Sequence, residues 1–214
     1  MKTSSDDEVR GLYEGNADDY AKRMDREIDF AVYAALFDRL AEGIAEVDGP
    51  LVDSSCGTGH MLSRYQERYD STRALTGVDL SPHMVAIARA MLGSRAQILL
   101  GDMRTLDNME DSSAAAVLSY FALHHVSPDD AQEALHEWHR VLRPEGKLAV
   151  ATWEGEGAID YEGESDLVAL RYTKDEIARW TEDAGFKVTR CVVEPVEEFP
   201  MAAVYLDATK NPSA

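Results

Sequence analysis

A chain of 214 residues, 45% hydrophobic and 8% aromatic, has the composition of one globular domain with a full core and not of a disordered protein. Its net charge of −19 disfavours binding to nucleic acid or anionic lipid. The N-terminal residues lack a signal-peptide pattern, and the longest nearly apolar run, AAAVLSYFALHHV, is shorter than the roughly 18 residues of a membrane span. We therefore expect a soluble, cytoplasmic protein without a membrane partner.

The N-terminal segment, residues 1–47, is polar and predicted to be helical, and we expect it to form a lid over a single domain, residues 48–214. In that domain, predicted strands and helices alternate. Ser81 as N-cap before Pro82 marks one helix start, and Pro144 with Gly146 marks one helix end. In chain order, the strands are 49–55, 74–80, 97–102, 114–120 and 147–153, and the helices are 60–69, 81–92, 128–142 and 173–185.

The last two predicted strands, 186–195 and 202–208, leave no room for a helix between them. A connection this short requires antiparallel pairing. The alternation before it predicts an α/β fold with a doubly wound, mainly parallel sheet that binds its ligand beyond the carboxyl ends of the strands. A dinucleotide dehydrogenase would normally continue with parallel units, so the closing hairpin argues against that class.

The segment LVDSSCGTGH, residues 51–60, runs from a predicted strand through a glycine turn into a predicted helix. Gly57 and Gly59 allow the backbone to turn sharply and approach a ligand closely. The following helix N-terminus offers N–H groups to an anionic group. The dinucleotide fingerprint would place a third glycine at position 62, which is leucine, so the pattern disfavours a pyrophosphate lying on this helix.

Besides Asp53, which ends the first predicted strand, two acids follow predicted strands. Asp79 offers two acceptor oxygens to the two ribose hydroxyls of an adenosyl ligand. The alternative role, an acid at the N-terminus of the next helix, is disfavoured because Ser81 already fills the cap position. Asp102 can accept from an adenine amino group, with the Met103 N–H beside it, or be a plain loop aspartate. With Asp53, these acids stand at three consecutive strand ends, and this conjunction predicts an adenosyl site.

The motifs together resemble those of class I S-adenosylmethionine-dependent methyltransferases, of the small-molecule type that acts in ubiquinone and menaquinone biosynthesis. DSSCGTGH resembles the first motif, D/E-x-G-x-G-x-G, and GVDLSPHMV, GDMRTL and HRVLRPEGKLAVATW resemble later ones. LYEGNADDYAKRM resembles the segment Y-x-x-x-A-x-x-Y. The resemblance implies a Rossmann-like sheet of seven strands in the order 3-2-1-4-5-7-6, with strand 7 antiparallel. It also implies S-adenosylmethionine as methyl donor and S-adenosylhomocysteine as product.

The resemblance further implies which residues bind the donor. Those of the glycine loop would surround the methionine part, those after the second and third strands the ribose and adenine, and Tyr120 or Phe121 the space near the sulfonium. The complete predicted set is Tyr13, Tyr20, Asp53, Ser55, Cys56, Gly57, Gly59, Asp79, Leu80, Met84, Asp102, Met103, Tyr120 and Phe121.

Ser55 stands where the family usually has its first glycine. Its hydroxyl can bond the donor's carboxylate or amine, or cap the loop, and we expect binding to survive because Gly57 and Gly59 remain. The predicted function is methyl transfer to an O, N, S or C atom of a small-molecule acceptor. The alternatives are a non-catalytic domain that binds donor or product, which Ser55 favours, and an NAD-dependent reductase.

Methyl transfer from a sulfonium mainly needs alignment, and a base only where the acceptor must lose a proton. His124, in LHHV after the fourth strand, is the candidate base, with Tyr120 near the methyl; the alternative is a loop element. Residues 154–166 hold six acids and, with the aromatic residues Trp153, Tyr161 and Tyr172 around them, could bind a cationic acceptor, or form a solvated loop. The two cysteines lack metal-type spacing, so no metal is expected, and the protein would be a monomer or homodimer.

Overall fold

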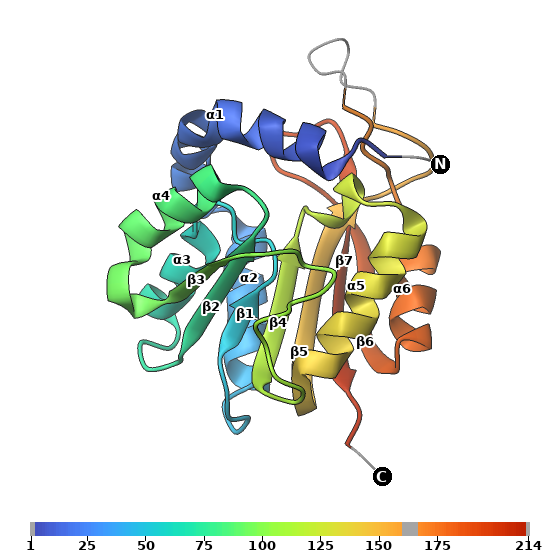
Figure 1. The fold of residues 1–214 in the computed structure, drawn as a ribbon. Coiled ribbons are helices and arrows are strands. Elements are labelled where there is room, and N and C mark those ends of the chain that lie inside the picture. The colour runs from blue at the N-terminus through green and yellow to red at the C-terminus, as the bar shows by residue number, and fades with distance from the viewer. Residues whose placement is uncertain (1–2, 160–166, 213–214) are drawn as a thin grey trace.

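The computed structural model describes residues 3–159 and 167–212 (Figure 1). The helices are α1 (Asp6–Glu27), α2 (Ala31–Gly43), α3 (His60–Arg68), α4 (Pro82–Leu92), α5 (Pro128–Val141) and α6 (Lys174–Asp183), with 3₁₀ turns η1 (Gly93–Arg95) and η2 (Leu123–His125). The strands are β1 (Leu51–Asp53), β2 (Leu75–Asp79), β3 (Gln97–Leu100), β4 (Ala114–Tyr120), β5 (Leu142–Trp153), β6 (Phe186–Pro195) and β7 (Ala202–Lys210). In this part of the chain, no helix is both long and apolar enough to cross a membrane.

The seven strands form one sheet in the order β3-β2-β1-β4-β5-β7-β6, as predicted. Neighbours from β3 to β5 are parallel, whereas β7 is antiparallel to both β5 and β6. The short connection between β6 and β7 imposes this reversal. The fold class expected from the sequence is therefore confirmed.

Alternate side chains of the central strands point to opposite faces and fill two cores. Val52 and Val117 belong to the core under α5 and α6, which also holds Trp138. Leu51 and Leu118 belong to the core under α2, α3 and α4, together with Phe37. This alternation follows from the period of two residues in a strand, and it buries the sheet on both faces.

The predicted helix start at Ser81 and Pro82 is found in the structure, whereas the predicted helix end at Pro144 and Gly146 differs. The Ser81 side chain accepts a hydrogen bond from the Met84 N–H at the start of α4, and Pro82 takes the first helical position. The sequence predicts a helix end at Pro144 and Gly146 and a fifth strand at residues 147–153, but β5 already begins at Leu142. The pairing with β4 is irregular there, and Glu145 has a φ of +66°, so the turn between helix and strand is absorbed into an irregular strand start.

Helix α1 lies across the edge of the sheet at which the parallel strands end (Figure 1). Its residues share a pocket with the loops that follow β1, β2, β3 and β4. The fold thereby brings the N-terminal segment and the strand-end acids together.

Candidate functional site

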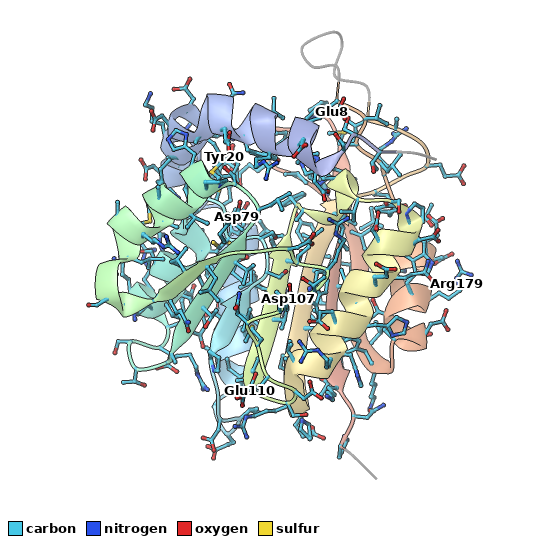
Figure 2. The ribbon with its side chains drawn as sticks, in the orientation of Figure 1. Glu8, Tyr20, Asp79, Asp107, Glu110 and Arg179 are labelled. Atoms are coloured by element: carbon cyan, nitrogen blue, oxygen red, sulfur yellow. The ribbon has the colours of Figure 1, made fainter. Side chains whose placement is uncertain are left out.

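A pocket lies between α1 and the carboxyl ends of β1 to β4, where doubly wound sheets bind ligands. Figure 2 shows Tyr20 on α1 and Asp79 at the end of β2, and both line this pocket. The residues of the predicted set that line it are Tyr13, Tyr20, Ser55, Gly57, Asp79, Leu80, Met84, Asp102, Met103, Tyr120 and Phe121.

Three residues of that set lie behind the pocket and not on its surface. Asp53 is 2% exposed and accepts a hydrogen bond from the Ser55 N–H, so it supports the loop from below. Cys56 is buried against Gly77, where an added Cβ would stand 2.8 Å from the Cys56 sulfur. Gly59 is the N-cap residue of α3, and there an added Cβ would meet Leu92 at 3.0 Å. These residues shape the loop through packing.

Two backbone N–H groups of the glycine loop donate to the end of β2, that of Cys56 to the Val78 carbonyl at 2.9 Å and that of Gly57 to the Asp79 carboxylate. Gly57 has a φ of +49°, a conformation that glycine adopts without steric cost. Its N–H donates to the Asp79 Oδ2 at 2.7 Å, and the Ser81 N–H donates to Oδ1 at 2.9 Å. Burial raises the Asp79 pKa, while these backbone hydrogen bonds oppose that change. Each carboxylate oxygen keeps a second lone pair for a ligand hydroxyl.

Ser55 replaces the expected glycine without backbone strain, because it is not among the residues with positive φ. Its Oγ is buried and has no hydrogen-bond partner among the described residues. A buried hydroxyl of this kind normally has a partner, and one that lines a pocket is free to bond a polar ligand atom. The substitution therefore leaves the loop able to hold a ligand.

Asp102 is held by Arg104, which the sequence reading did not single out. The Arg104 guanidinium makes a bidentate ion pair with Asp102 and also reaches Asp6 on α1 at 2.5 Å. A third acid, Asp130 on α5, lies 3.5 Å away. Burial would raise the Asp102 pKa, but the Arg104 hydrogen bonds and charge outweigh it and lower the pKa. The one signal for this contact in the sequence is the position of Arg104 in GDMRTL, two residues after Asp102.

The two histidines of LHHV have different surroundings. His124, the predicted base, is 5% exposed, and its ring lies in the core and not on the pocket surface. His125 lines the pocket, and its Nε2 lies 2.8 Å from the Tyr13 hydroxyl oxygen. Burial lowers the pKa of His125 to about 4 and holds the pKa of His124 well below its ordinary value. Because η2 turns the chain between them, the geometry favours His125 over His124 for contact with a ligand.

A second connection ties the end of α1 to the glycine loop. The His60 Nε2 lies 3.0 Å from the Asp25 carboxylate, and its Nδ1 lies 2.7 Å from the Thr58 hydroxyl. Thr58 is 1% exposed, which leaves no access for a substrate. Asp25, His60 and Thr58 are connected in the order of a catalytic triad, but here they form a structural link between α1 and α3.

The acidic segment lies partly outside the described residues, which exclude 160–166. Of its predicted aromatic partners, Trp153 packs on Phe121 with ring centroids 4.8 Å apart. The buried Tyr172 hydroxyl donates to the Val126 carbonyl. Both rings are thus committed to packing around the pocket wall. Among the described residues, no group of three or more His, Cys, Asp or Glu side chains is placed to hold a metal ion.

Comparison with known proteins finds a family match over the part of the chain that holds the glycine loop, Asp79 and Asp102. Residues 51–146 match the family described as Methyltransferase domain. An uncharacterized 37.1 kDa protein of transposon TN4556 from Streptomyces fradiae is 31% identical over 171 residues, which are 73% of this chain and 47% of that protein. A demethylmenaquinone methyltransferase of Chlamydia caviae is 34% identical over 101 residues, 47% of this chain and 42% of that protein. The chain spans less than half the length of these two relatives.

Among solved structures, the fold is similar to 1,6-didemethyltoxoflavin-N1-methyltransferase of Burkholderia thailandensis, determined with 1,6-didemethyltoxoflavin and S-adenosylhomocysteine bound. The TM-score is 0.72 at 20% identity, over 95% of this chain and 87% of that one. Likeness at this identity shows a shared fold and does not transfer the acceptor.

Proposed function

We propose that this chain, which carries a class I S-adenosylmethionine-dependent methyltransferase domain, transfers the methyl group of S-adenosylmethionine to a small-molecule acceptor. The acceptor atom would be O, N, S or C, and the second product S-adenosylhomocysteine. The observation that carries this proposal is the convergence of Gly57, Asp79 and Asp102, from three consecutive strand ends, on one pocket.

The residues present fit this donor. Ser55 Oγ and the Gly57 backbone would hold its amino-acid end, Asp79 its ribose hydroxyls, and Asp102 with Met103 its adenine. The bound donor supplies an already activated methyl group, so the protein's task is alignment. Tyr120 and Phe121 would place aromatic faces beside the sulfonium.

The charge of the pocket supports a cationic donor. Among the described residues that line it, Asp6, Asp79 and Asp102 are acidic, Arg10 is the one arginine or lysine, and burial keeps His125 neutral near pH 7. Arg10 is itself paired with Asp7. Arg104 offsets the charges of Asp6 and Asp102, so Asp79 is the carboxylate of this group that is left to favour a sulfonium in a partly desolvated site.

We further propose that residues 1–47 act as a lid, since α1 contributes Tyr13 and Tyr20 to the pocket wall. A lid excludes water from the donor and completes the acceptor site. The partner would be a small molecule and not nucleic acid, in keeping with the net charge of −19. A cytoplasmic location and a monomeric or homodimeric state remain predictions.

The test is titration calorimetry with S-adenosylhomocysteine, on the wild type and on Asp79→Ala. Hydrogen bonds to a charged group contribute about 1.5–3 kcal/mol, so the variant should bind roughly 10- to 100-fold more weakly. Unchanged affinity would overturn the role of Asp79. Donor binding without methyl transfer to any compound of a broad acceptor panel would support a non-catalytic binding domain instead.

A further inference from the structure

His125 lies between two hollows of the molecule. On one side it lines the proposed donor pocket, together with Tyr13, Tyr120 and Phe121. On the other side it lines a polar recess whose further walls include Asp6, Arg104 and Asp130. A titratable ring shared by a reaction pocket and an acid-lined recess is placed to move a proton from one to the other.

The hydrogen bond between Tyr13 and His125 can form with either neutral tautomer of the imidazole. Its Nδ1 is buried without a partner among the described residues, and its Nε2 lies 2.8 Å from the Tyr13 hydroxyl oxygen. In a neutral ring one nitrogen carries hydrogen and the other accepts. A relay towards His125 requires Nε2 to accept from the Tyr13 hydroxyl, and Nδ1 then carries the hydrogen. Nε2 is then a proton acceptor that is already aligned.

We propose that Tyr13 and His125 form a proton relay and that the acceptor is a hydroxyl compound, which must lose a proton as it is methylated. This inference rests on the proposed function. It names Tyr13 as the group that touches the acceptor, because Tyr13 lines the pocket from α1 while its oxygen faces His125.

The step balances in atoms and charge. The acceptor oxygen forms a bond to the methyl carbon while the bond from that carbon to sulfur breaks, and the electron pair of the broken bond stays on sulfur. The acceptor's hydroxyl proton passes to the Tyr13 oxygen as the Tyr13 proton passes to the His125 Nε2. The positive charge leaves the sulfonium and appears on the imidazolium, so the net charge between the two hollows is unchanged.

The groups around His125 support the return of this proton to solvent. The ring centroids of His125 and His124 are 3.9 Å apart, and burial keeps His124 neutral. Asp6 and Asp130 line the recess beside it, and Arg104 between them is paired with both and with Asp102. Burial disfavours the imidazolium, so it releases its proton readily after turnover, and the carboxylates of the recess are placed to accept that proton on its way to solvent.

The first experiment uses ¹⁵N NMR of histidine in the complex with S-adenosylhomocysteine. We expect His125 at pH 7 to be neutral, with hydrogen on Nδ1 and a hydrogen-bonded Nε2 that loses this signature in Tyr13→Phe. Hydrogen on Nε2, or an imidazolium at pH 7, would overturn the relay. If S-adenosylhomocysteine does not bind the wild type, it is the proposed function that fails, so the two failures are distinguishable.

The second experiment compares 4-methylphenol with 4-methylbenzenethiol as acceptors of the same shape. The thiol ionises near neutral pH, whereas the phenol keeps its proton and needs the relay. His125→Gln and Tyr13→Phe should each lower kcat for the phenol by about 10²- to 10⁴-fold, and the double variant should be no worse. The same variants should change the thiol rate less than tenfold, and equal losses for both acceptors would overturn the proposal.

Matched controls are His136→Gln, on the exposed surface of α5, and Tyr69→Phe, at the end of α3. Neither residue lines either hollow, and both variants should keep wild-type rates with the phenol. Because burial places the His125 pKa at about 4, the wild-type kcat should also be flat between pH 6 and pH 8. A rise through the ordinary histidine range would contradict a base that is already neutral there.

Discussion

The two halves of the pocket are built by different means. The half around the glycine loop and β2 is made by backbone groups and buried carboxylates, with Gly57 donating to Asp79. The half around η2 is made by side chains that join distant segments, with Tyr13 facing His125 and Asp6 facing Arg104. The first half depends on local chain conformation, and the second depends on where α1 docks. Mutations should therefore affect the first half through stability and the second through the position of α1.

The largest expected effect is the pH dependence at Asp53. Burial, aided by the Asp79 charge and opposed by the Ser55 N–H, raises the Asp53 pKa to about 7. The folded state then holds a proton that the unfolded chain releases near pH 4, so the free energy of unfolding falls as pH rises from about 4 to about 7. Relative to Asp53→Asn, the wild type should lose roughly 3–4 kcal/mol over this range.

The measurement is urea denaturation of both proteins at several pH values between 4 and 8. The difference between the two proteins isolates Asp53 from other titrating groups. A difference that does not change with pH would show that Asp53 is already ionised in the folded protein at pH 4. The hydrogen bond from the Ser55 N–H would then stabilise the carboxylate as much as burial destabilises it.

Next in size are two glycine-to-alanine substitutions, which should change the free energy of unfolding in opposite directions. Gly59 has a φ of +88°, and an added Cβ would meet Leu92 at 3.0 Å. Gly59→Ala should therefore lower the free energy of unfolding by about 2–3 kcal/mol. Gly11 on α1 has nothing within 4 Å of an added Cβ, so Gly11→Ala should raise it by about 0.5–1 kcal/mol. Equal effects in thermal unfolding would contradict the assigned conformations.

The first half of the pocket could be predicted from the sequence because its parts follow one another along the chain. A glycine turn between a strand and a helix fixes where the loop lies, and the alternation of strands and helices places Asp79 and Asp102 at the same sheet edge. The closing antiparallel hairpin likewise follows from a connection too short for a helix. Backbone geometry carried these predictions.

The second half could not be predicted because its contacts depend on how α1 packs. Tyr13 and His125 are 112 residues apart, and Arg104 and Asp6 are 98 residues apart. No spacing rule relates such positions. Within LHHV, the choice between His124 and His125 depends on a single 3₁₀ turn, which rotates one ring into the core and the other to the pocket.

A smaller effect is expected from Arg104→Met, which removes the ion pairs to Asp6 and Asp102. The Arg104 side chain is 19% exposed, so the pairs are only partly screened, and the loss should be about 1–2 kcal/mol in unfolding free energy. The wild-type advantage should shrink when NaCl is raised from about 0.05 to 0.5 M. Arg10→Met, whose pair with the exposed Asp7 lies at the surface, is the control and should change stability by less than about 0.5 kcal/mol.

The smallest effect is expected at the other end of α1, with Asp25→Asn. Asp25 is 71% exposed, so its contact with His60 is open to water and should contribute less than about 0.5 kcal/mol to unfolding. The same change should still loosen the end of α1 from the glycine loop, because the asparagine amide is a weaker partner for the imidazole. Amide hydrogen exchange in the last turns of α1 should therefore rise while the sheet stays protected. If exchange instead rises across β1 and α3, then α1 and the glycine loop unfold as one unit, and the two halves of the pocket are less independent than their construction indicates.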